Sequence, residues 1–295
     1  MTKKKKRFDW VTCGFIAPSF ILFTLFIIVP TIASVYYSFT SWDGISPNVR
    51  FIGLRNYIEI FTSARFGNAL KNTVVMTVFI SIFENLTALI LALIVDNIKW
   101  GKNLFRSAFY IPVLISGIVS GFIWKIMYNY NFGAINSVLK NIGIGNFTQD
   151  WLGNVSLTLI MVGVVLVWKG AGYYMIIYLA SLQGISTDVV EAAKIDGASS
   201  VQRLRNITLP LISGAFTINF TLSLINGLKV FDQISVMTDG GPGFTSETVV
   251  YLLYKVGFGE GRQGFGTAIG IVLLFLIMIL NTLQQKFLRS REVQM

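Results

Sequence analysis

Six long apolar stretches constrain the fold of this chain more than any other feature of its sequence. Each exceeds the length of about 20 apolar residues that an α-helix needs to cross roughly 30 Å of hydrocarbon. Only 13% of the residues are charged, whereas a soluble domain carries about 25%. The sequence therefore predicts an all-α integral membrane protein with six transmembrane helices. The predicted spans are residues 11–38, 70–96, 104–127, 155–183, 207–228 and 264–287.

The first stretch follows a run of five basic residues, 3–7, as the apolar part of a signal peptide would. Its apolar segment, residues 11–35, is too long for such a peptide, and no clear small-residue cleavage site follows it. We therefore expect a retained helix that is kinked or loosened near Pro18 and Pro30.

The basic residues predict the orientation of the chain in the membrane. Fourteen of the 24 Lys and Arg residues lie in segments 1–10, 97–106, 184–206 and 286–295, and seven lie in the longer segments on the other side. Because Lys and Arg are enriched on the cytoplasmic side, both termini are expected there. Residues 1–10 are then a basic tail, and 11–295 form one transmembrane domain. The same distribution accounts for the net charge of +10 without any nucleic acid partner.

Several classes of catalyst are disfavoured by what the chain lacks. It has no histidine and a single cysteine, Cys13, so neither a cysteine cluster nor imidazole chemistry is available, and we expect no metal site. No GxxxxGK[ST] phosphate-binding loop occurs, so the chain is not expected to bind or hydrolyse ATP. A membrane-embedded enzyme needs a convergent set of acids and bases, and a channel needs a selectivity constriction. Neither is evident.

The polar segment 184–206 predicts a structured loop between the fourth and fifth spans. Asp188 and Glu191 have the spacing of a capping box, which would begin a helix at about Val189. This helix is expected to end at Asp196, with Gly197 providing the turn.

A second short helix is expected to start at Ser199 or Ser200 and to run through Leu204, with Pro210 marking the start of the fifth span. The local chemistry alone is equally compatible with a solvated loop that has ordinary helix caps. Its small and basic side chains could instead approach another protein or lipid phosphates; these are Ala192, Ala193, Lys194, Arg203 and Arg205.

The spacing of residues in this segment favours a contact with another protein over a solvated loop. Glu191-Ala192-Ala193, then Gly197 after three residues and Ile207 after nine more, followed by Leu209-Pro210, resembles the EAA signature of ABC importer permeases. Ser186 departs from the proline that is usual in relatives. Further matches indicate the carbohydrate-type, maltose-permease-like branch; they include Phe51–Leu54, Asn72-Thr73, Ile111-Pro112, Trp124-Lys125, Trp168-Lys169, Leu179–Gln183 and Lys229–Asp232.

The resemblance implies a type I ABC importer permease fold in a bacterial inner membrane. It implies a permease subunit that is not itself an enzyme, half of a pathway for a sugar or oligosaccharide. The expected partners are a second permease, normally a different chain, two cytoplasmic ATPase subunits that use ATP and Mg, and an extracellular binding protein. A glycerol phosphodiester is an alternative solute. In this family segment 184–206 couples the permease to the ATPase, which implies roles for Asp188, Glu191, Ala192, Ala193, Asp196, Gly197 and Arg203.

Ionisable side chains inside spans are candidates for a substrate pathway. Lys169 lies in the fourth span with Tyr173 and Tyr174 on the next turn, and Glu84 lies in the second span. Lys169 and Glu84 could form a structural ion pair or line a cavity. In the fifth span, three polar residues share one helical face and could serve interhelical hydrogen bonds or a cavity. These three are Asn219, Ser223 and Asn226.

The outside segment 229–263 contains a turn at Gly240-Gly241-Pro242. By itself this sequence predicts only a loop. In the family that the chain resembles, this region contacts the sugar-delivering binding protein, so the three residues are candidates for that contact.

Overall fold

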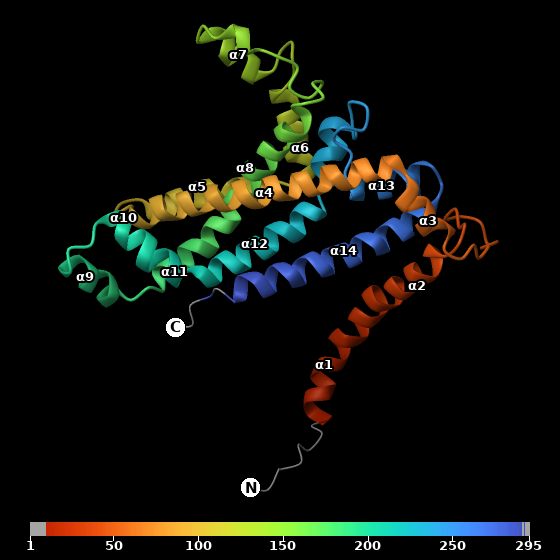
Figure 1. Ribbon diagram of the computed structural model, residues 1–295, viewed down its shortest axis with the longest axis horizontal. Helices are drawn as coiled ribbons and strands as arrows, with labels where there is room; N and C mark the ends of the chain where they lie inside the picture. Colours follow the sequence, from red (N-terminus) through yellow and green to blue (C-terminus); the bar gives the residue numbers. More distant parts are fainter. Residues whose placement is uncertain (1–9, 291, 293–295) are drawn as a thin grey trace. The chain divides into compact units, whose positions relative to one another are not determined.

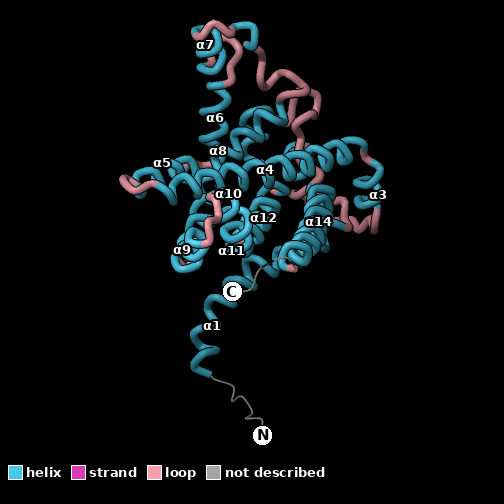
Figure 2. The backbone as a smooth tube through the Cα atoms, turned by 60° about the vertical axis from the view of Figure 1, so that its left-hand side comes forward, coloured by secondary structure: helices cyan, strands magenta, loops and turns pink. Residues whose placement is uncertain are grey.

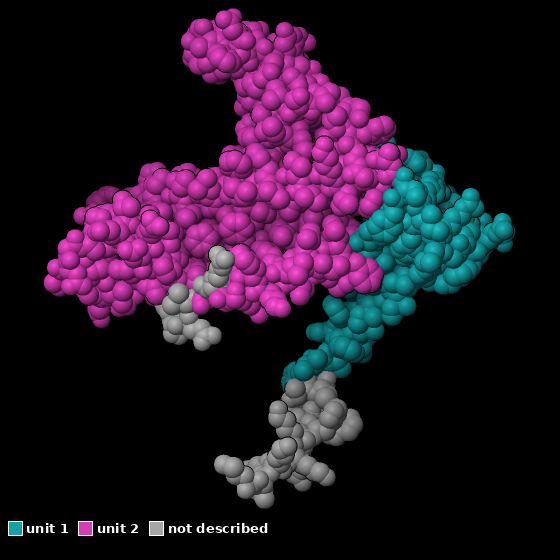
Figure 3. Space-filling view, viewed as in Figure 1, with its two compact units in different colours: residues 1–62, 253–272 teal, residues 63–252, 273–295 magenta. Residues whose placement is uncertain are grey.

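The computed structural model describes residues 10–290 and Glu292. Helices joined by loops make up this part of the chain, without any β-strand, and one isolated β-bridge joins Thr40 to Phe51 (Figures 1 and 2). The described residues form two compact units (Figure 3). One comprises the described residues up to Thr62 with Leu253–Val272, and the other comprises Ser63–Leu252 with the described residues from Leu273 onward. The predicted all-α fold is confirmed.

The first unit begins with a long apolar helix, Gly14–Ser38, that could cross a membrane by itself. This stretch lies within a continuous helical segment made of α1 (Trp10–Phe23), a π-helical turn (Thr24–Ile28) and α2 (Val29–Ser38). Pro30 follows the π-helical turn closely. Because proline has no N–H for the carbonyl four residues earlier and its ring crowds that carbonyl, the helix widens there. The predicted loosening is therefore found at Pro30, whereas Pro18 lies inside the regular helix α1.

The rest of the first unit surrounds a buried asparagine. Asn56, on α3 (Arg55–Thr62), donates hydrogen bonds from Nδ2 to the carbonyl oxygens of Ser38 and Thr40 at 2.8 and 2.9 Å. These bonds satisfy carbonyls at the end of α2, which have no partner within the helix. The unit also contains the end of α13 (Val249–Tyr254), a π-helical turn (Lys255–Gly259) and the first part of α14 (Gln263–Arg289).

The second unit is a bundle organised around one long helix, α4 (Ala64–Asn97), which packs along α8 (Thr158–Gln183) and α12 (Ser213–Leu228) (Figure 1). Glycines permit close approach between helices of this unit. A Cβ atom at Gly172 would lie 2.1 Å from the Phe109 carbonyl oxygen, and one at Gly227 would lie 2.8 Å from the Thr77 Cα. The unit's other helices are α5 (Lys102–Leu114), α6 (Gly117–Met127), α7 (Ala134–Asn141), α9 (Thr187–Ile195), α10 (Ser200–Arg203) and α11 (Leu209–Leu211), with π-helical turns at Leu204–Thr208 and Ile234–Thr238.

Two of the predicted spans are broken rather than straight. The third span consists of α5 and α6, which meet at 95°. Pro112 removes a hydrogen bond near the end of α5, and the Ser116 Oγ starts α6 by accepting the Val119 N–H at 3.2 Å. The fifth span bends by 66° between Leu211 and Ser213, so Pro210 lies before the bend and not at the start of a straight span.

Within the described residues, four helices are each long and apolar enough to cross a membrane. Counting each bent pair as one span brings the number to six, the number of predicted spans. The observed helices for the second, fourth and sixth spans are Ala64–Asn97, Thr158–Gln183 and Gln263–Arg289.

Candidate functional site

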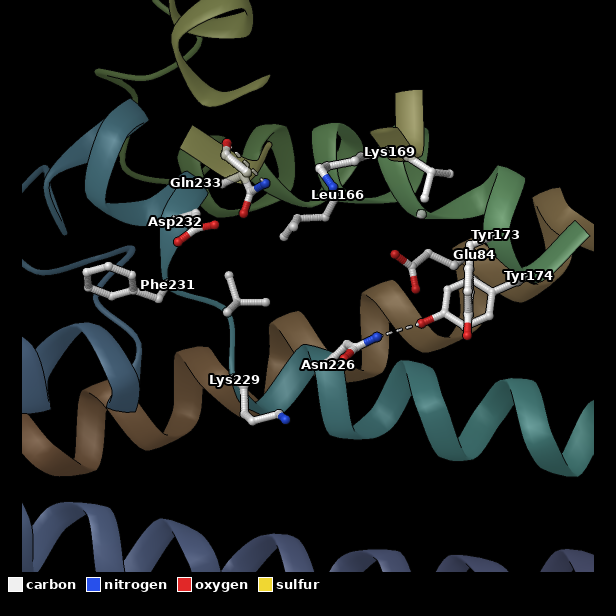
Figure 4. A pocket seen from close by; sticks show the side chains of 14 residues that line it. Glu84, Leu166, Lys169, Tyr173, Tyr174, Asn226, Lys229, Phe231, Asp232 and Gln233 are labelled. Atoms are coloured by element: carbon white, nitrogen blue, oxygen red, sulfur yellow. Dashed lines mark hydrogen bonds between the residues drawn. The ribbon is translucent and has the colours of Figure 1, made fainter. Parts of the chain in front are cut away.

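A cavity of about 460 Å³ lies in the second unit between α4, α8 and the segment that follows α12 (Figure 4). Two acidic and two basic side chains line it together with tyrosine and phenylalanine rings and two amides. The lining residues are Glu84, Val113, Gly117, Leu166, Lys169, Gly170, Tyr173, Tyr174, Asn226, Lys229, Val230, Phe231, Asp232 and Gln233.

Glu84 lies near the middle of α4 and is only 5% exposed. Its carboxylate packs on the backbone of α8, because a Cβ atom at Gly170 would lie 2.2 Å from Glu84 Oε1. Glu84 Oε2 has no hydrogen-bond partner among the described residues. Lys169 lines the same cavity, but the described part of the chain shows no ion pair between the two. Of the two interpretations of these charges, the geometry favours cavity lining.

The polar stripe of the fifth span makes interhelical hydrogen bonds. Asn219 Nδ2 donates to the Tyr174 carbonyl oxygen at 3.1 Å, and Asn226 Nδ2 donates to the Tyr174 hydroxyl at 3.2 Å. Ser223 Oγ accepts from Asn85 Nδ2 at 3.1 Å. Asn219 and Ser223 are fully buried in these helix contacts, and of the three only Asn226 lines the cavity.

Sequence reasoning missed several residues around this site. Asn85 joins two helices, since its Oδ1 also accepts the Tyr178 hydroxyl at 2.7 Å. Lys229, Asp232 and Gln233 line the cavity, although the sequence places them just beyond the fifth span, in an outside loop. The polar residues directly after that span could have indicated that this segment also contributes to the cavity.

The coupling segment, residues 184–206, contains the predicted two helices. The predicted cap of the first helix is wrong: Ser186 is the N-cap of α9 and its Oγ accepts the Asp188 N–H at 3.3 Å, while Asp188 lies in the first turn. Ser186 thus supplies an acceptor for a free N–H group at the start of α9. Gly197 has φ +79°, as expected for the turn after the helix.

Ser199 is the cap of the second helix, and its Oγ and the Gln202 side chain form a capping box. The Arg203 guanidinium donates to the Ala198 carbonyl oxygen at 2.5 Å and so holds the turn between the helices. Among the predicted coupling residues, Ala193 is buried. Five of the other predicted coupling residues are exposed to solvent: Asp188, Glu191, Ala192, Asp196 and Gly197.

The segment that follows the turn at Gly240-Gly241-Pro242 is fixed to the start of α4. Ser246 Oγ donates to the Gly241 carbonyl oxygen at 2.7 Å. Arg65 forms a two-pronged ion pair with Glu247, at 2.9 and 2.8 Å, and its guanidinium lies 4.9 Å from the centre of the Phe244 ring. A neighbouring serine therefore bonds to the turn, and a side chain distant in sequence, Arg65, holds the segment that follows it.

Residues 84–293 match the family described as binding-protein-dependent transport system inner membrane component. The chain belongs to this family. It is a multi-pass membrane permease subunit, a transmembrane component and not an enzyme.

Curated relatives of this permease match over nearly its whole length. It is 35% identical over 300 residues to the probable starch degradation products transport system permease protein AmyD of Thermoanaerobacterium thermosulfurigenes, with 100% of both chains covered. It is 33% identical over 288 residues to the multiple sugar-binding transport system permease protein MsmF of Streptococcus mutans, covering 98% of this chain and 97% of the relative.

Solved structures show that the permease has the fold of an ABC importer subunit. A chain of a bacterial ABC transporter involved in the import of the acidic polysaccharide alginate matches with a TM-score of 0.84, 24% identity and 96% coverage of each chain. The same transporter in complex with an alginate-bound periplasmic protein matches with a TM-score of 0.84 and 23% identity. At this level of identity the likeness concerns the fold alone.

Proposed function

We propose that this permease forms half of the transmembrane pathway of an ATP-driven importer of a sugar or oligosaccharide. A second permease chain would form the other half, an extracellular binding protein would deliver the solute, and two cytoplasmic ATPase subunits would use ATP and Mg. Both termini would lie in the cytoplasm of a bacterial cell. Relatives matching this chain at 33–35% identity carry names of starch-product and multiple-sugar transport systems, which supports the proposed solute class.

The lining of the cavity carries this proposal. A sugar presents both C–H faces and hydroxyl groups, so its site needs aromatic rings beside polar side chains. The cavity offers the 41% exposed Tyr173, the Tyr174 hydroxyl, the Asn226 amide and the carboxylate of Glu84. In the membrane, such polar groups are costly unless they are paired or serve a polar passenger.

The coupling segment supports an ATPase partner. Its two capped helices form a compact projection in which Ile195 is 87% exposed and Val201 is 74% exposed. Two large apolar side chains beside the small residues Ala192 and Gly197 suit a groove on another protein. We assign this surface to the ATPase, and the outside turn at Gly240-Gly241-Pro242 to the binding protein.

The proposal is tested by co-expressing the permease with a candidate second permease and ATPase from the same genome, and by measuring sugar uptake into proteoliposomes with a candidate binding protein present. Accumulation of a sugar that depends on ATP is expected. Purification of the permease in a working assembly without an ATPase would refute the proposal, as would ATP-driven uptake of a solute that is not a sugar.

A glycine pair offers a matched test of the coupling segment. Gly197 and Gly143 have φ of +79° and +85°, and a Cβ atom would meet nothing within 4 Å at either position. Gly197→Asp and Gly143→Asp therefore impose similar backbone strain without a clash inside the permease. Gly197→Asp is expected to uncouple ATP hydrolysis from uptake, whereas Gly143→Asp is expected to leave uptake unchanged. Equal uptake by the two variants would contradict the assigned contact.

A further inference from the structure

The buried Glu84 carboxylate is a group whose hydrogen-bonding capacity the fold leaves unfilled. Within the described residues, Oε2 is buried and has no partner, and Lys169 forms no ion pair with it. A buried carboxyl oxygen without a hydrogen-bond partner is costly, so its position beside a cavity indicates that a ligand completes it. Figure 4 shows the carboxylate reaching from α4 towards the hollow, beside the rings of Tyr173 and Tyr174.

The neighbours of Glu84 can complete a site for a polyhydroxylated ligand. The Tyr174 hydroxyl accepts a hydrogen bond from Asn226 at 3.2 Å, so its own proton can be donated to Glu84 or to a ligand. Tyr173 is 41% exposed and its ring is perpendicular to that of Tyr174, with centroids 5.4 Å apart. The site therefore combines a carboxylate acceptor, a hydroxyl donor and an aromatic face, which match the O–H and C–H groups of a sugar ring.

The charges of the cavity also select between sugar classes. Its four charged lining residues are Glu84, Asp232, Lys169 and Lys229, so the lining carries no excess of positive charge. Glu84 is the most buried of the four, at 5% exposure, while Lys169 is partly exposed and Lys229 is exposed. When Glu84 is ionised, a sugar carboxylate placed beside it would meet a like charge in a medium that screens it weakly.

We propose that Glu84 determines specificity in this permease by accepting a hydrogen bond from a hydroxyl of a neutral sugar and by excluding acidic sugars. This inference rests on the proposed function and narrows its substrate class. It separates the permease from the structurally similar transporter that imports an acidic polysaccharide. Gly170 is a positioning residue, because any side chain there would displace the carboxylate.

The first experiment measures ATP-driven uptake of two panels by the complete transporter, one of neutral di- and trisaccharides and one of uronic acid di- and trimers. Uptake of neutral sugars alone is expected. Uptake of a uronic acid oligomer at a similar rate would overturn the inference while leaving the proposed sugar permease intact. Uptake from neither panel would count against the proposed function itself.

The second experiment measures equilibrium binding of the labelled neutral sugar, and of a uronic acid trimer, to the purified permease–ATPase complex without the binding protein. Glu84→Gln is expected to weaken neutral sugar binding at least tenfold and to strengthen binding of the uronic acid trimer. Gly170→Ala, which keeps the charge but moves the carboxylate, should weaken neutral sugar binding without that second change. Glu292→Gln is the control and should alter neither.

Assembly with the ATPase is monitored by co-purification, and Glu84→Asp provides a charge-conserving variant if Glu84→Gln does not assemble. Glu84→Asp should still reject the uronic acid trimer, because the negative charge remains in the cavity. Unchanged neutral sugar binding in assembled Glu84→Gln, or binding of the uronic acid trimer by Glu84→Asp, would overturn the assignment.

Discussion

The ion pair between Arg65 and Glu247 should behave as a buried pair, in which each side chain stabilises the fold only while its partner is present. Both guanidinium–carboxylate contacts are short, at 2.9 and 2.8 Å, and the Glu247 side chain is 1% exposed while that of Arg65 is 28% exposed. Removing one partner of a buried pair costs about 3–5 kcal/mol, because the other charge is left without compensation. Arg65→Met leaves the fully buried Glu247 uncompensated and is expected to cost this full amount, whereas Glu247→Met leaves the partly hydrated Arg65 and is expected to cost less, about 2–3 kcal/mol.

The double variant gives the sharper result. When both charges are replaced by methionine, no buried charge remains, and an apolar pair of similar volume is often neutral or stabilising. Arg65→Met/Glu247→Met is therefore expected to be more stable than either single variant, in thermal unfolding of the purified permease followed by tryptophan fluorescence. If the two single effects simply added in the double variant, the reasoning about the buried charge would be refuted.

A second ion pair in the chain supplies the control. Arg262 and Glu59 are 2.7 Å apart, but their side chains are 44% and 42% exposed. Exposed pairs contribute about 0–1 kcal/mol, so Arg262→Met should shift the unfolding midpoint far less than Arg65→Met does. A larger effect at Arg262 would show that burial does not set the energies of these pairs.

Three other substitutions test the site and the bundle. Glu191→Lys should uncouple ATP hydrolysis from uptake, because it reverses an exposed charge on α9; sugar accumulation and ATPase activity are measured together, and normal accumulation would contradict the assignment. Lys169→Ala should lower transport while the complex still co-purifies, and loss of the assembled complex would indicate a structural role instead. Gly172→Ala should reduce thermal stability, since its Cβ would lie 2.1 Å from a carbonyl oxygen of α5, whereas Gly67→Ala, with nothing within 4 Å, should not.

The apolar stretches predicted where the helices lie but not where they break. A span prediction averages hydropathy over about 20 residues, so a cap or a proline inside the window has little weight in it. Pro112 and Ser116 end one helix and begin another inside the third predicted span, and both signals are visible in the sequence. Searching for helix-capping residues and prolines inside the apolar stretches, and not only at their ends, would have predicted this break.

The coupling segment was predictable because its local signals agree with one another. Gly197 takes the left-handed conformation and Ser199 begins the second helix, as their residue types favour. The first cap was assigned wrongly because Ser186 and Asp188 are both good capping residues two positions apart. Which of them caps depends on where the chain leaves α8, at Gly184, and that is a property of the packed bundle.

The polar residues inside the spans mark the limit of what sequence can decide in this permease. Asn219, Ser223, Glu84 and Lys169 are all costly in hydrocarbon, so their sequence positions predict only that each faces something other than lipid. The structure separates them by hydrogen bonding and by access to the cavity. Ser223 is fully buried and accepts a hydrogen bond from Asn85 on a neighbouring helix, whereas the fully buried Asn219 donates to the Tyr174 carbonyl oxygen but keeps its Oδ1 without a partner among the described residues. Glu84 also has an unpartnered oxygen, but unlike Asn219 it lines the cavity, and this difference makes Glu84 the stronger candidate for a contact with the solute.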